Sequence, residues 1–364
     1  MKRIALTGGG TGGHIYPLIA VAEHLEGCEC RYFGPRNAFS EAIEKAGMRI
    51  SPIAGAKMRR YFSLMNAVDG VKFAWSIAQA FVKVGIFRPH AAFSKGGPGA
   101  LPVLMACRLY GVPIVVHESD NVPGLVNRVT GKWAKIAELG WEGAAEWFPG
   151  KETRAVGVPL RTDTMRCAGS DPREAKAALG LDPEKPLILV IGGSQGSARM
   201  NDLVMEALPE LLARYGVIHQ IGSATYADCM ARLGTMEKEL AAGLRPNYRP
   251  SEFLDSDMAS AYAAADCVVS RAGSAIFEIA AYGKPAVLIP LPEAANDHQR
   301  VNATTYAATG AAIMLEEKDA SKETLISTIE TAMGENEAMS AAAKRFAKPD
   351  AAKKIAEDII GIAN

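Results

Sequence analysis

The sequence lacks three features that mark specialised classes of protein. It has no uninterrupted run of about 18 apolar residues, so we expect no membrane-spanning helix. Its 40 Lys and Arg residues balance 40 Asp and Glu residues, which gives no support for binding to nucleic acid. The first predicted strand begins at Lys2, which leaves no room for a signal peptide.

Cysteine is scarce and scattered, with six residues at positions 28, 30, 107, 167, 229 and 267. The separation of Cys28 and Cys30 fits neither a zinc motif nor a redox motif. We therefore expect small buried thiols in a reducing, cytosolic setting, with no metal and no cofactor.

The composition fits a globular protein with two domains. A chain of 364 residues is long enough for two domains of ordinary size. Hydrophobic residues make up 49% of it and charged residues 22%, which is enough to bury substantial cores and argues against disorder.

The most distinctive stretch is residues 7–14, Thr-Gly-Gly-Gly-Thr-Gly-Gly-His. It lies between the apolar run at residues 4–6 and apolar residues at helical spacing, so we predict strand, glycine loop and helix. Such a loop presents backbone N–H groups to an anion, and His14 is a candidate proton acceptor beside it. The alternative is a tight turn with an incidental histidine. The glycine spacing matches neither the usual dinucleotide motif nor the P-loop.

Strands and helices alternate along both halves of the chain. We predict strands at residues 30–34, 91–94, 113–117, 186–191, 217–221, 267–270 and 286–290. Helices are expected at residues 39–47 and 101–109. This alternation predicts two α/β, doubly wound, Rossmann-like domains, each a parallel sheet covered by helices on both faces.

The alternation pauses near residues 157–161, where we place the domain boundary. The expected parts are residues 1–160, residues 161–340 and a C-terminal helix at 341–364 that Pro349 interrupts. Two such domains facing each other would place their glycine loops at a central cleft, because ligands bind outside the carboxyl ends of parallel strands.

The segment 58–90 is both basic and apolar. It holds five Lys or Arg residues against one acidic residue, Asp69. On a helix, Trp75 lies about 200° from Phe73, so the apolar surface exceeds one core-facing stripe. Two interpretations remain open: a helix that binds an anionic membrane surface, or a helix wedged between other elements with Trp75 buried.

Further polar loops follow predicted strands, and together they suggest a nucleotide-sugar site. Ser194 and Ser274 begin helices, where hydroxyls and N–H groups bind phosphate. The carboxylate of Glu278 suits a ribose diol. The amides of Gln299 and Asn302 suit sugar hydroxyls.

Two patterns look like metal sites but are too small for one. Asp255 and Asp257 form a DxD pattern, for which helix capping is the simpler explanation. His117 and Glu118 are too few ligands for zinc.

Taken together, these motifs resemble the MurG family of peptidoglycan transferases over nearly the whole chain. The resemblance rests on residues 9–17, 94–97, 117–120, 123–125, 158–161, 192–196, 271–274 and 299–303. It implies a metal-independent, inverting glycosyltransferase of the GT-B fold. Such an enzyme moves N-acetylglucosamine (GlcNAc) from UDP-GlcNAc to the C4 hydroxyl of the N-acetylmuramic acid (MurNAc) of lipid I, forming lipid II for cell-wall synthesis, cell shape and division.

The resemblance also implies a division of labour between the domains. The first domain would take the undecaprenyl-pyrophosphoryl-MurNAc-pentapeptide acceptor, the second would bind UDP-GlcNAc, and the C-terminal helix would pack back on the first. The segment after Met58 would dock peripherally on the anionic inner membrane surface, at its cytoplasmic face.

Individual site residues follow from the matched motifs. His14 would be the catalytic base, and Thr11, Gly12 and Gly13 would touch the donor near its sugar. Uracil would lie between Arg161 and the backbone of Phe253 and Leu254. The resemblance assigns a phosphate to Ser194, the ribose to Glu278 and the GlcNAc hydroxyls to Gln299.

The chain departs from the family pattern in two places. Residues 117–120 read His-Glu-Ser-Asp where some members read His-Glu-Gln-Asn, so either Asp120 or Asn121 would meet the ligand. The stretch 271–278 is one residue shorter, which leaves the register of Ser274 and Glu278 open.

Two other functions fit the same architecture. A UDP-GlcNAc 2-epimerase would need carboxylates and a histidine around C2 of the sugar, and no acceptor. A binding protein for sugar nucleotides or lipids would release no UDP. Release of UDP that depends on lipid I separates all three.

Overall fold

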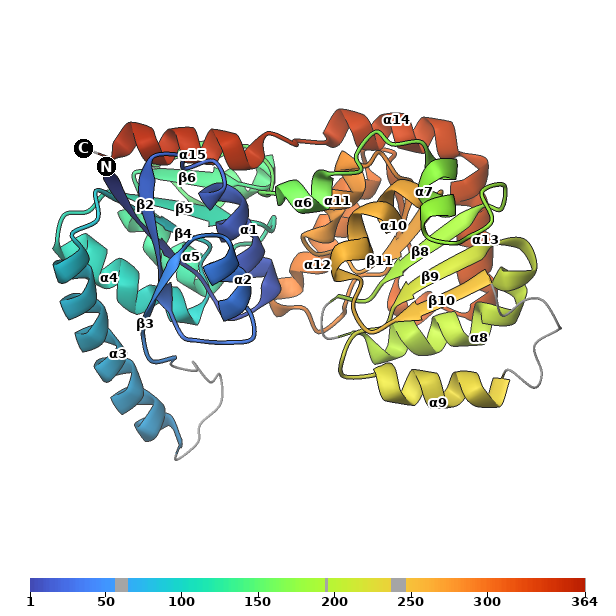
Figure 1. Ribbon diagram of the computed structural model, residues 1–364, viewed down its shortest axis with the longest axis horizontal. Coiled ribbons are helices and arrows are strands. Elements are labelled where there is room, and N and C mark those ends of the chain that lie inside the picture. The colour runs from blue at the N-terminus through green and yellow to red at the C-terminus, as the bar shows by residue number, and fades with distance from the viewer. Residues whose placement is uncertain (56–64, 194–195, 237–246, 364) are drawn as a thin grey trace. The chain divides into compact units, whose positions relative to one another are not determined.

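The computed structural model describes residues 1–55, 65–193, 196–236 and 247–363, and it divides the chain into two compact units (Figure 1). Unit 1 comprises Met1–Thr162 with Lys348–Asn364, and unit 2 comprises Asp163–Ala347. Each unit contains a parallel sheet, so the predicted pair of doubly wound α/β domains is confirmed.

In the described part of unit 1, seven parallel strands have the order β3-β2-β1-β4-β5-β6-β7. The strands are β1 Lys2–Thr7, β2 Cys28–Gly34, β3 Arg49–Pro52, β4 Ala91–Ser94, β5 Ile114–Glu118, β6 Ile136–Leu139 and β7 Glu152–Ala155. The main helices are α1 Gly12–Ala22, α2 Ser40–Lys45, α3 Met65–Phe87, α4 Leu101–Leu109, α5 Leu125–Thr130 and α15 Ala351–Ile362. In register, Leu6 of β1 lies between Tyr32 and Phe93.

Both faces of this sheet are buried, which explains why apolar residues fill the middle of its central strands. Ile4 and Leu6 contribute to a core shared with α1 and α15. Ala5, which points to the other face, contributes to a core shared with α3 and α4. The sheet is therefore covered by a helical layer on each side.

In the described part of unit 2, six parallel strands have the order β10-β9-β8-β11-β12-β13. The strands are β8 Leu187–Ile191, β9 Gly216–Gln220, β10 Tyr248–Ser251, β11 Cys267–Ser270, β12 Ala286–Leu288 and β13 Ala312–Met314. The α-helices from the boundary onward are α6 Thr162–Met165, α7 Pro172–Ala178, α8 Ala198–Arg214, α9 Tyr226–Met236, α10 Met258–Ala264, α11 Ala275–Ala281, α12 His298–Ala307, α13 Lys322–Gly334 and α14 Asn336–Phe346.

The last stretch of the chain forms two helices that belong to different units. α14 ends at Phe346, whose ring packs on Phe277 and Tyr306 of unit 2. After Pro349, α15 begins at Ala351 and buries Ile355 and Ile359 in the core of unit 1. Unit 2 therefore extends to Ala347, beyond the boundary at 340 expected from the sequence.

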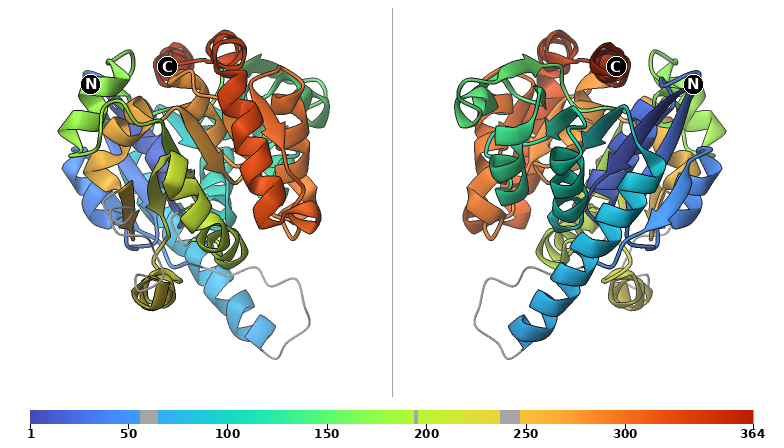
Figure 2. Two further views of the ribbon diagram at one scale, coloured as in Figure 1. Left: turned by 90° about the vertical axis from the view of Figure 1, so that its right-hand side faces the viewer. Right: turned by 90° about the vertical axis from the view of Figure 1, so that its left-hand side faces the viewer.

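Helix α3 presents apolar side chains on two faces, and its first turns project from the body of unit 1 (Figure 2). Ala80, Val84 and Phe87 are buried in the unit 1 core. Trp75 is 60% exposed, so the interpretation in which a neighbour buries it is wrong. Part of the basic, apolar segment, residues 58–64, lies outside the described residues.

The sequence predicts no membrane-spanning helix, and one helix nevertheless passes a test of length and composition. Among the described helices, the part of α3 from Asp69 to Phe87 is long and apolar enough to cross one, by length and composition. A search for uninterrupted apolar runs misses it because charged residues such as Lys72 and Lys83 divide the segment.

Candidate functional site

Each sheet gathers polar side chains at its carboxyl edge, beside the point where strand order reverses. In unit 1 this point lies between β1 and β4, and in unit 2 between β8 and β11. Doubly wound sheets bind ligands at such switch points. The glycine loops singled out in the sequence follow strands β1, β4 and β8 at these edges.

The first loop brings together Thr11, Gly12, Gly13 and His14, as the sequence predicts. Thr11 is the N-cap of α1, with extended backbone angles of φ −109° and ψ 159°. Its hydroxyl does not cap the helix; Oγ1 lies 2.8 Å from Nδ1 of His14 instead. The loop therefore fixes the orientation of the imidazole.

Burial, and secondarily the charge of Lys95, lowers the pKa of His14 to about 4. The ring is consequently neutral near pH 7 and has a lone pair available to accept a proton.

The loop after β4 packs directly against the first loop. Gly97 has φ +83°, a conformation that favours glycine. A Cβ atom there would lie 2.7 Å from Cα of Gly9 and 3.3 Å from Nε2 of His14. Glycine at this position thus permits the close approach that places Nε2 of His14 against the second loop.

Lys95 is a buried cation at the centre of this edge. Its Nζ lies 2.8 Å from Nδ1 of His117 and also donates to Oγ of Ser119. His117 Nε2 donates to the carbonyl of Gly157 at 2.8 Å, because a carbonyl can only accept; Nδ1 therefore accepts from Lys95. Burial lowers the pKa of Lys95 to about 8.

Glu118 organises the turn after β5. Its carboxylate accepts from the N–H of Asp120 at 3.1 Å, from the N–H of Gly124 at 3.1 Å and from Nδ2 of Asn127 at 2.9 Å. Burial raises the pKa of Glu118. Asp120 and the buried Asn121 both lie on this turn, so either could contact a ligand there. Lys95 and Asn127 were not among the predicted site residues.

Arg161 is placed by an aromatic ring of unit 1. Its Cζ lies 4.1 Å from the centroid of the Tyr16 ring, a cation–π contact with helix α1. The guanidinium is therefore held beside the first loop.

In unit 2 the corresponding edge encloses a pocket of about 440 Å³. It is lined by Ile191, Gly192, Gly193, Gly196, Ser197, Ala198, Arg199, Ser270, Arg271, Gly273, Ser274, Ala275, Leu291 and Gln299. Two predicted site residues, Ser274 and Gln299, are thus brought together here, and Oε1 of Gln299 accepts from the N–H of Leu291 at 3.0 Å. Ser194 lies outside the described residues.

Four other predicted residues of unit 2 do not line this pocket. Asn302 is buried, and its Nδ2 donates to the carbonyl of Ala272 at 3.1 Å, so it supports the loop after β11. Glu278 accepts from the hydroxyl of Tyr262 at 2.7 Å. Leu254 donates its N–H to Oε1 of Gln220 at 3.2 Å, and the neighbouring Phe253 is partly exposed.

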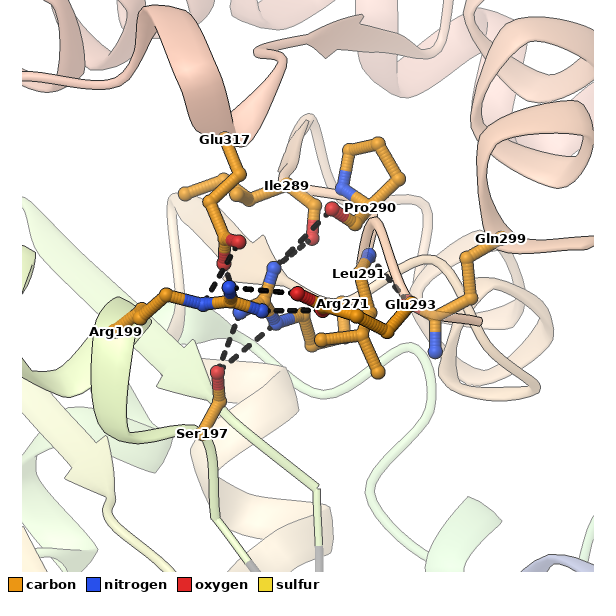
Figure 3. A network of polar contacts seen from close by, with 9 residues as sticks. All are labelled: Ser197, Arg199, Arg271, Ile289, Pro290, Leu291, Glu293, Gln299 and Glu317. Atoms are coloured by element: carbon orange, nitrogen blue, oxygen red, sulfur yellow. Dashed lines mark hydrogen bonds and ion pairs between the residues drawn. The ribbon is translucent and has the colours of Figure 1, made fainter. Parts of the chain in front are cut away.

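A network of arginines and carboxylates borders the pocket (Figure 3). Arg271 donates from Nη1 to the carbonyl of Ile289 at 2.9 Å and from Nε to Oγ of Ser197 at 3.1 Å, and it pairs with Glu317. Arg199 pairs with Glu317 and Glu293. The site prediction missed these charges, because they come from segments far apart in the sequence.

The two patterns that look like metal sites in the sequence have other partners in the structure. Across the residues that the structure describes, no group of three or more His, Cys, Asp or Glu side chains could hold a metal ion. The explanation offered for Asp257 was wrong, however. It makes no capping hydrogen bond to α10 and pairs instead with Arg249 at 2.7 Å.

Two family models match the chain, one in each half. The model of the "Glycosyltransferase family 28 N-terminal domain" matches residues 4–137. The model of the "Glycosyltransferase family 28 C-terminal domain" matches residues 187–357.

Relatives match over the full length. A Bacillus cereus protein named UDP-N-acetylglucosamine–N-acetylmuramyl-(pentapeptide) pyrophosphoryl-undecaprenol N-acetylglucosamine transferase 2 is 34% identical, over 99% of each chain. The crystal structure of Acinetobacter baumannii MurG matches with a TM-score of 0.75 and 26% identity, over 99% of this chain and 100% of that one. A UDP-GlcNAc 2-epimerase of Neisseria meningitidis, bound to UDP-GlcNAc, has a TM-score of 0.69 at 12% identity, over 99% of this chain and 100% of that one, a likeness of fold alone.

Proposed function

Because the chain belongs to glycosyltransferase family 28, we propose that it transfers GlcNAc from UDP-GlcNAc to the C4 hydroxyl of MurNAc in lipid I, which yields lipid II. The observation that carries the proposal is the 34% identity, over 99% of both chains, to a transferase named for this reaction. The resemblance to the MurG family inferred from the motifs is confirmed at the level of family membership.

The pocket of unit 2 is the proposed donor site. Its volume of about 440 Å³ falls within the range of small-molecule sites. The N-terminus of α8 and the hydroxyl of Ser274 offer donors for the diphosphate. Gln299 would bind the GlcNAc hydroxyls, Glu278 the ribose and Ser194 a phosphate. Asn302, whose Nδ2 donates to the carbonyl of Ala272, would support this site from the loop after β11.

Uracil recognition is proposed for residues outside this pocket. In unit 2, Phe253 and Leu254 would contact the base, and the partly exposed ring of Phe253 offers apolar surface for it. Asp120 or Asn121, on the turn that Glu118 organises, would contact the acceptor.

The proposed reaction is a single in-line displacement with His14 as the base. The hydroxyl oxygen on C4 of MurNAc attacks the anomeric carbon, its proton passes to Nε2 of His14, and the bond to UDP breaks with inversion. For this, Nδ1 of His14 must carry the proton that it donates to Oγ1 of Thr11, 2.8 Å away. The acceptor's negative diphosphate would raise the low pKa of His14 towards a value suited to a base.

A turnover assay with both substrates tests the function. UDP release by the purified chain should require lipid I, and the product should be β-linked. Replacing His14 by Ala should lower turnover by about 10²-fold or more while UDP binding persists. UDP-GlcNAc epimerised without an acceptor would favour the epimerase instead, and binding without any turnover would favour a binding protein.

We further propose that unit 1 docks peripherally on an anionic membrane, at its cytoplasmic face, through α3. Val71, Trp75, Val82 and Ile86 are exposed and fall within about 60° of one another around the helix. The exposed Lys72 adds positive charge nearby. Because the opposite face of α3 is buried in the core of unit 1, docking along the surface preserves packing that crossing the membrane would remove.

A further inference from the structure

Arg199 lines the unit 2 pocket from the first turn of α8 and has two different carboxylate partners (Figure 3). Its Nε lies 2.9 Å from Oε2 of Glu317. Its outer edge pairs with Glu293, with Nη1 2.8 Å from Oε1 and Nη2 bonded to Oε2. One guanidinium therefore joins a carboxylate on each side.

The partner on the Nε side is firmly held. The side chain of Glu317 is only 12% exposed, and it also pairs with Arg271. Arg271 is itself buried and fixed by the carbonyls of Ile289 and Pro290 and by Oγ of Ser197. Glu317 thus anchors the Nε edge of Arg199 in a fixed orientation.

The partner on the outer side is exposed. The side chain of Glu293 is 62% exposed and that of Arg199 is 53% exposed. Glu293 lies on the loop between β12 and the short 3-10 helix Ala295–Asp297. Ion pairs at such exposure contribute little stability, so Glu293 can leave Arg199 at small cost.

The outer edge of Arg199 offers the two parallel N–H donors that suit phosphate as well as carboxylate. A diphosphate entering the pocket also meets the positive end of the α8 dipole. Its negative charge repels Glu293 and attracts Arg199. The carboxylate of Glu293 therefore occupies the donors that a diphosphate would take.

We propose that Arg199 binds the diphosphate of the nucleotide donor and that Glu293 competes with the diphosphate for Arg199. This rests on the proposed function, in which the pocket takes UDP-GlcNAc. Arg199 is then a binding residue, and Glu317 is a positioning residue that aims it.

Calorimetric titration of the full-length chain with UDP, and with uridine as a probe without phosphates, tests this. R199A should weaken UDP binding by about tenfold or more, and E293Q should strengthen it by about threefold. The gain from E293Q should be smaller in the double variant R199A/E293Q than in the unaltered chain, because only the direct repulsion between Glu293 and the diphosphate remains once Arg199 is gone. Uridine binding should not change in any variant.

A matched control comes from an exposed ion pair between α9 and α8. Arg232 pairs with Asp202 of α8, and neither residue lines the pocket, so R232A should bind UDP as the unaltered chain does. If R199A and E293Q leave UDP binding unchanged, or change uridine binding equally, this proposal is overturned. If the unaltered chain does not bind UDP, the proposed function itself fails and this proposal fails with it.

Discussion

Oγ1 of Thr11 lies 2.8 Å from Nδ1 of His14, so the residue that begins helix α1 also holds the imidazole of the proposed base. Threonine at an N-cap ordinarily gives its side-chain oxygen to the helix backbone. Here the hydroxyl binds the His14 side chain instead. The conformation of the glycine loop therefore determines which nitrogen of the His14 imidazole carries the proton.

Removing this hydroxyl should impair catalysis more than binding. In T11V the imidazole loses the acceptor for Nδ1–H, so we expect kcat to fall by about 10- to 100-fold with little change in KM. T11S retains the hydroxyl and should keep most of the activity. Steady-state kinetics with lipid I checks both variants, and an equal loss in T11S would contradict the proposed orientation.

The pH profile should report the low pKa of His14. Because that pKa is about 4, the ring stays neutral as pH falls, and kcat/KM should lose no activity to its protonation until pH approaches 5. Removing the charge of Lys95 in K95M should move this acid limb to higher pH. The limb should still lie below pH 6.5, the ordinary pKa of histidine, because burial is the larger cause of the low pKa of His14.

K95M also leaves Nδ1 of His117 without its donor, so a general loss of activity is not diagnostic. The informative measurement is the position of the acid limb, or the titration of His14 by NMR. An unchanged His14 titration in a folded K95M protein would show that Lys95 does not act on His14.

The central strands were predictable because each contains a short run of apolar residues. β4 and β11 have the bounds expected from the sequence, since burial on both faces leaves only the last residue of each, Ser94 and Ser270, polar. The edge strands β3, β7, β10 and β13 were missed. β7, for example, reads Glu-Thr-Arg-Ala, and its side chains alternate between exposed and half-buried positions, as those of an edge strand can.

The glycine loops were predictable for a similar reason, because glycine runs after apolar strands are a local signal. The polar pairs were not. Lys95 reaches His117 because β4 and β5 are neighbours, and Arg199 reaches Glu293 because β8 and β12, with β11 between them, end at the same edge of the sheet. Strand order is a property of the folded sheet, and no spacing along the chain encodes these distances.

β6 was missed because a buried carboxyl interrupts its apolar run, and this carboxyl should make stability depend on pH. Glu138 is fully buried and lies beside Asp358 of α15. Burial, and then Asp358 of α15, raises its pKa to about 9. The folded state therefore keeps a proton that the unfolded chain releases near pH 4.5.

Stability should fall as pH rises between these two values, because unfolding releases the proton. E138Q removes this loss, so at pH 8.5 its free energy of unfolding should exceed that of the unaltered chain by about 1–2 kcal/mol. This difference corresponds to a Tm that is higher by roughly 2–8 °C. The two should converge near pH 5. Thermal unfolding across this range checks the prediction, with E146Q as an exposed control. A constant difference at every pH would contradict the titration of Glu138.

Binding to vesicles should depend on the exposed stripe of α3. W75S/I86S removes two of its large apolar side chains, each more than half exposed, and should lower the partition coefficient on phosphatidylglycerol vesicles by about tenfold or more. Tm should change little, because neither residue belongs to the core. V301S, at an exposed valine of unit 2, is the matched control and should bind normally.

Varying the lipid charge and the salt concentration then separates the electrostatic contribution to membrane binding from the apolar contribution. Neutral phosphatidylcholine vesicles should bind the unaltered chain more weakly, and added salt should weaken binding only to the anionic vesicles. K72E should reproduce that electrostatic loss while keeping the apolar contribution, since it leaves the stripe intact. Equal binding of W75S/I86S and the unaltered chain would mean that another surface of the protein meets the membrane, and that α3 is exposed for a different reason.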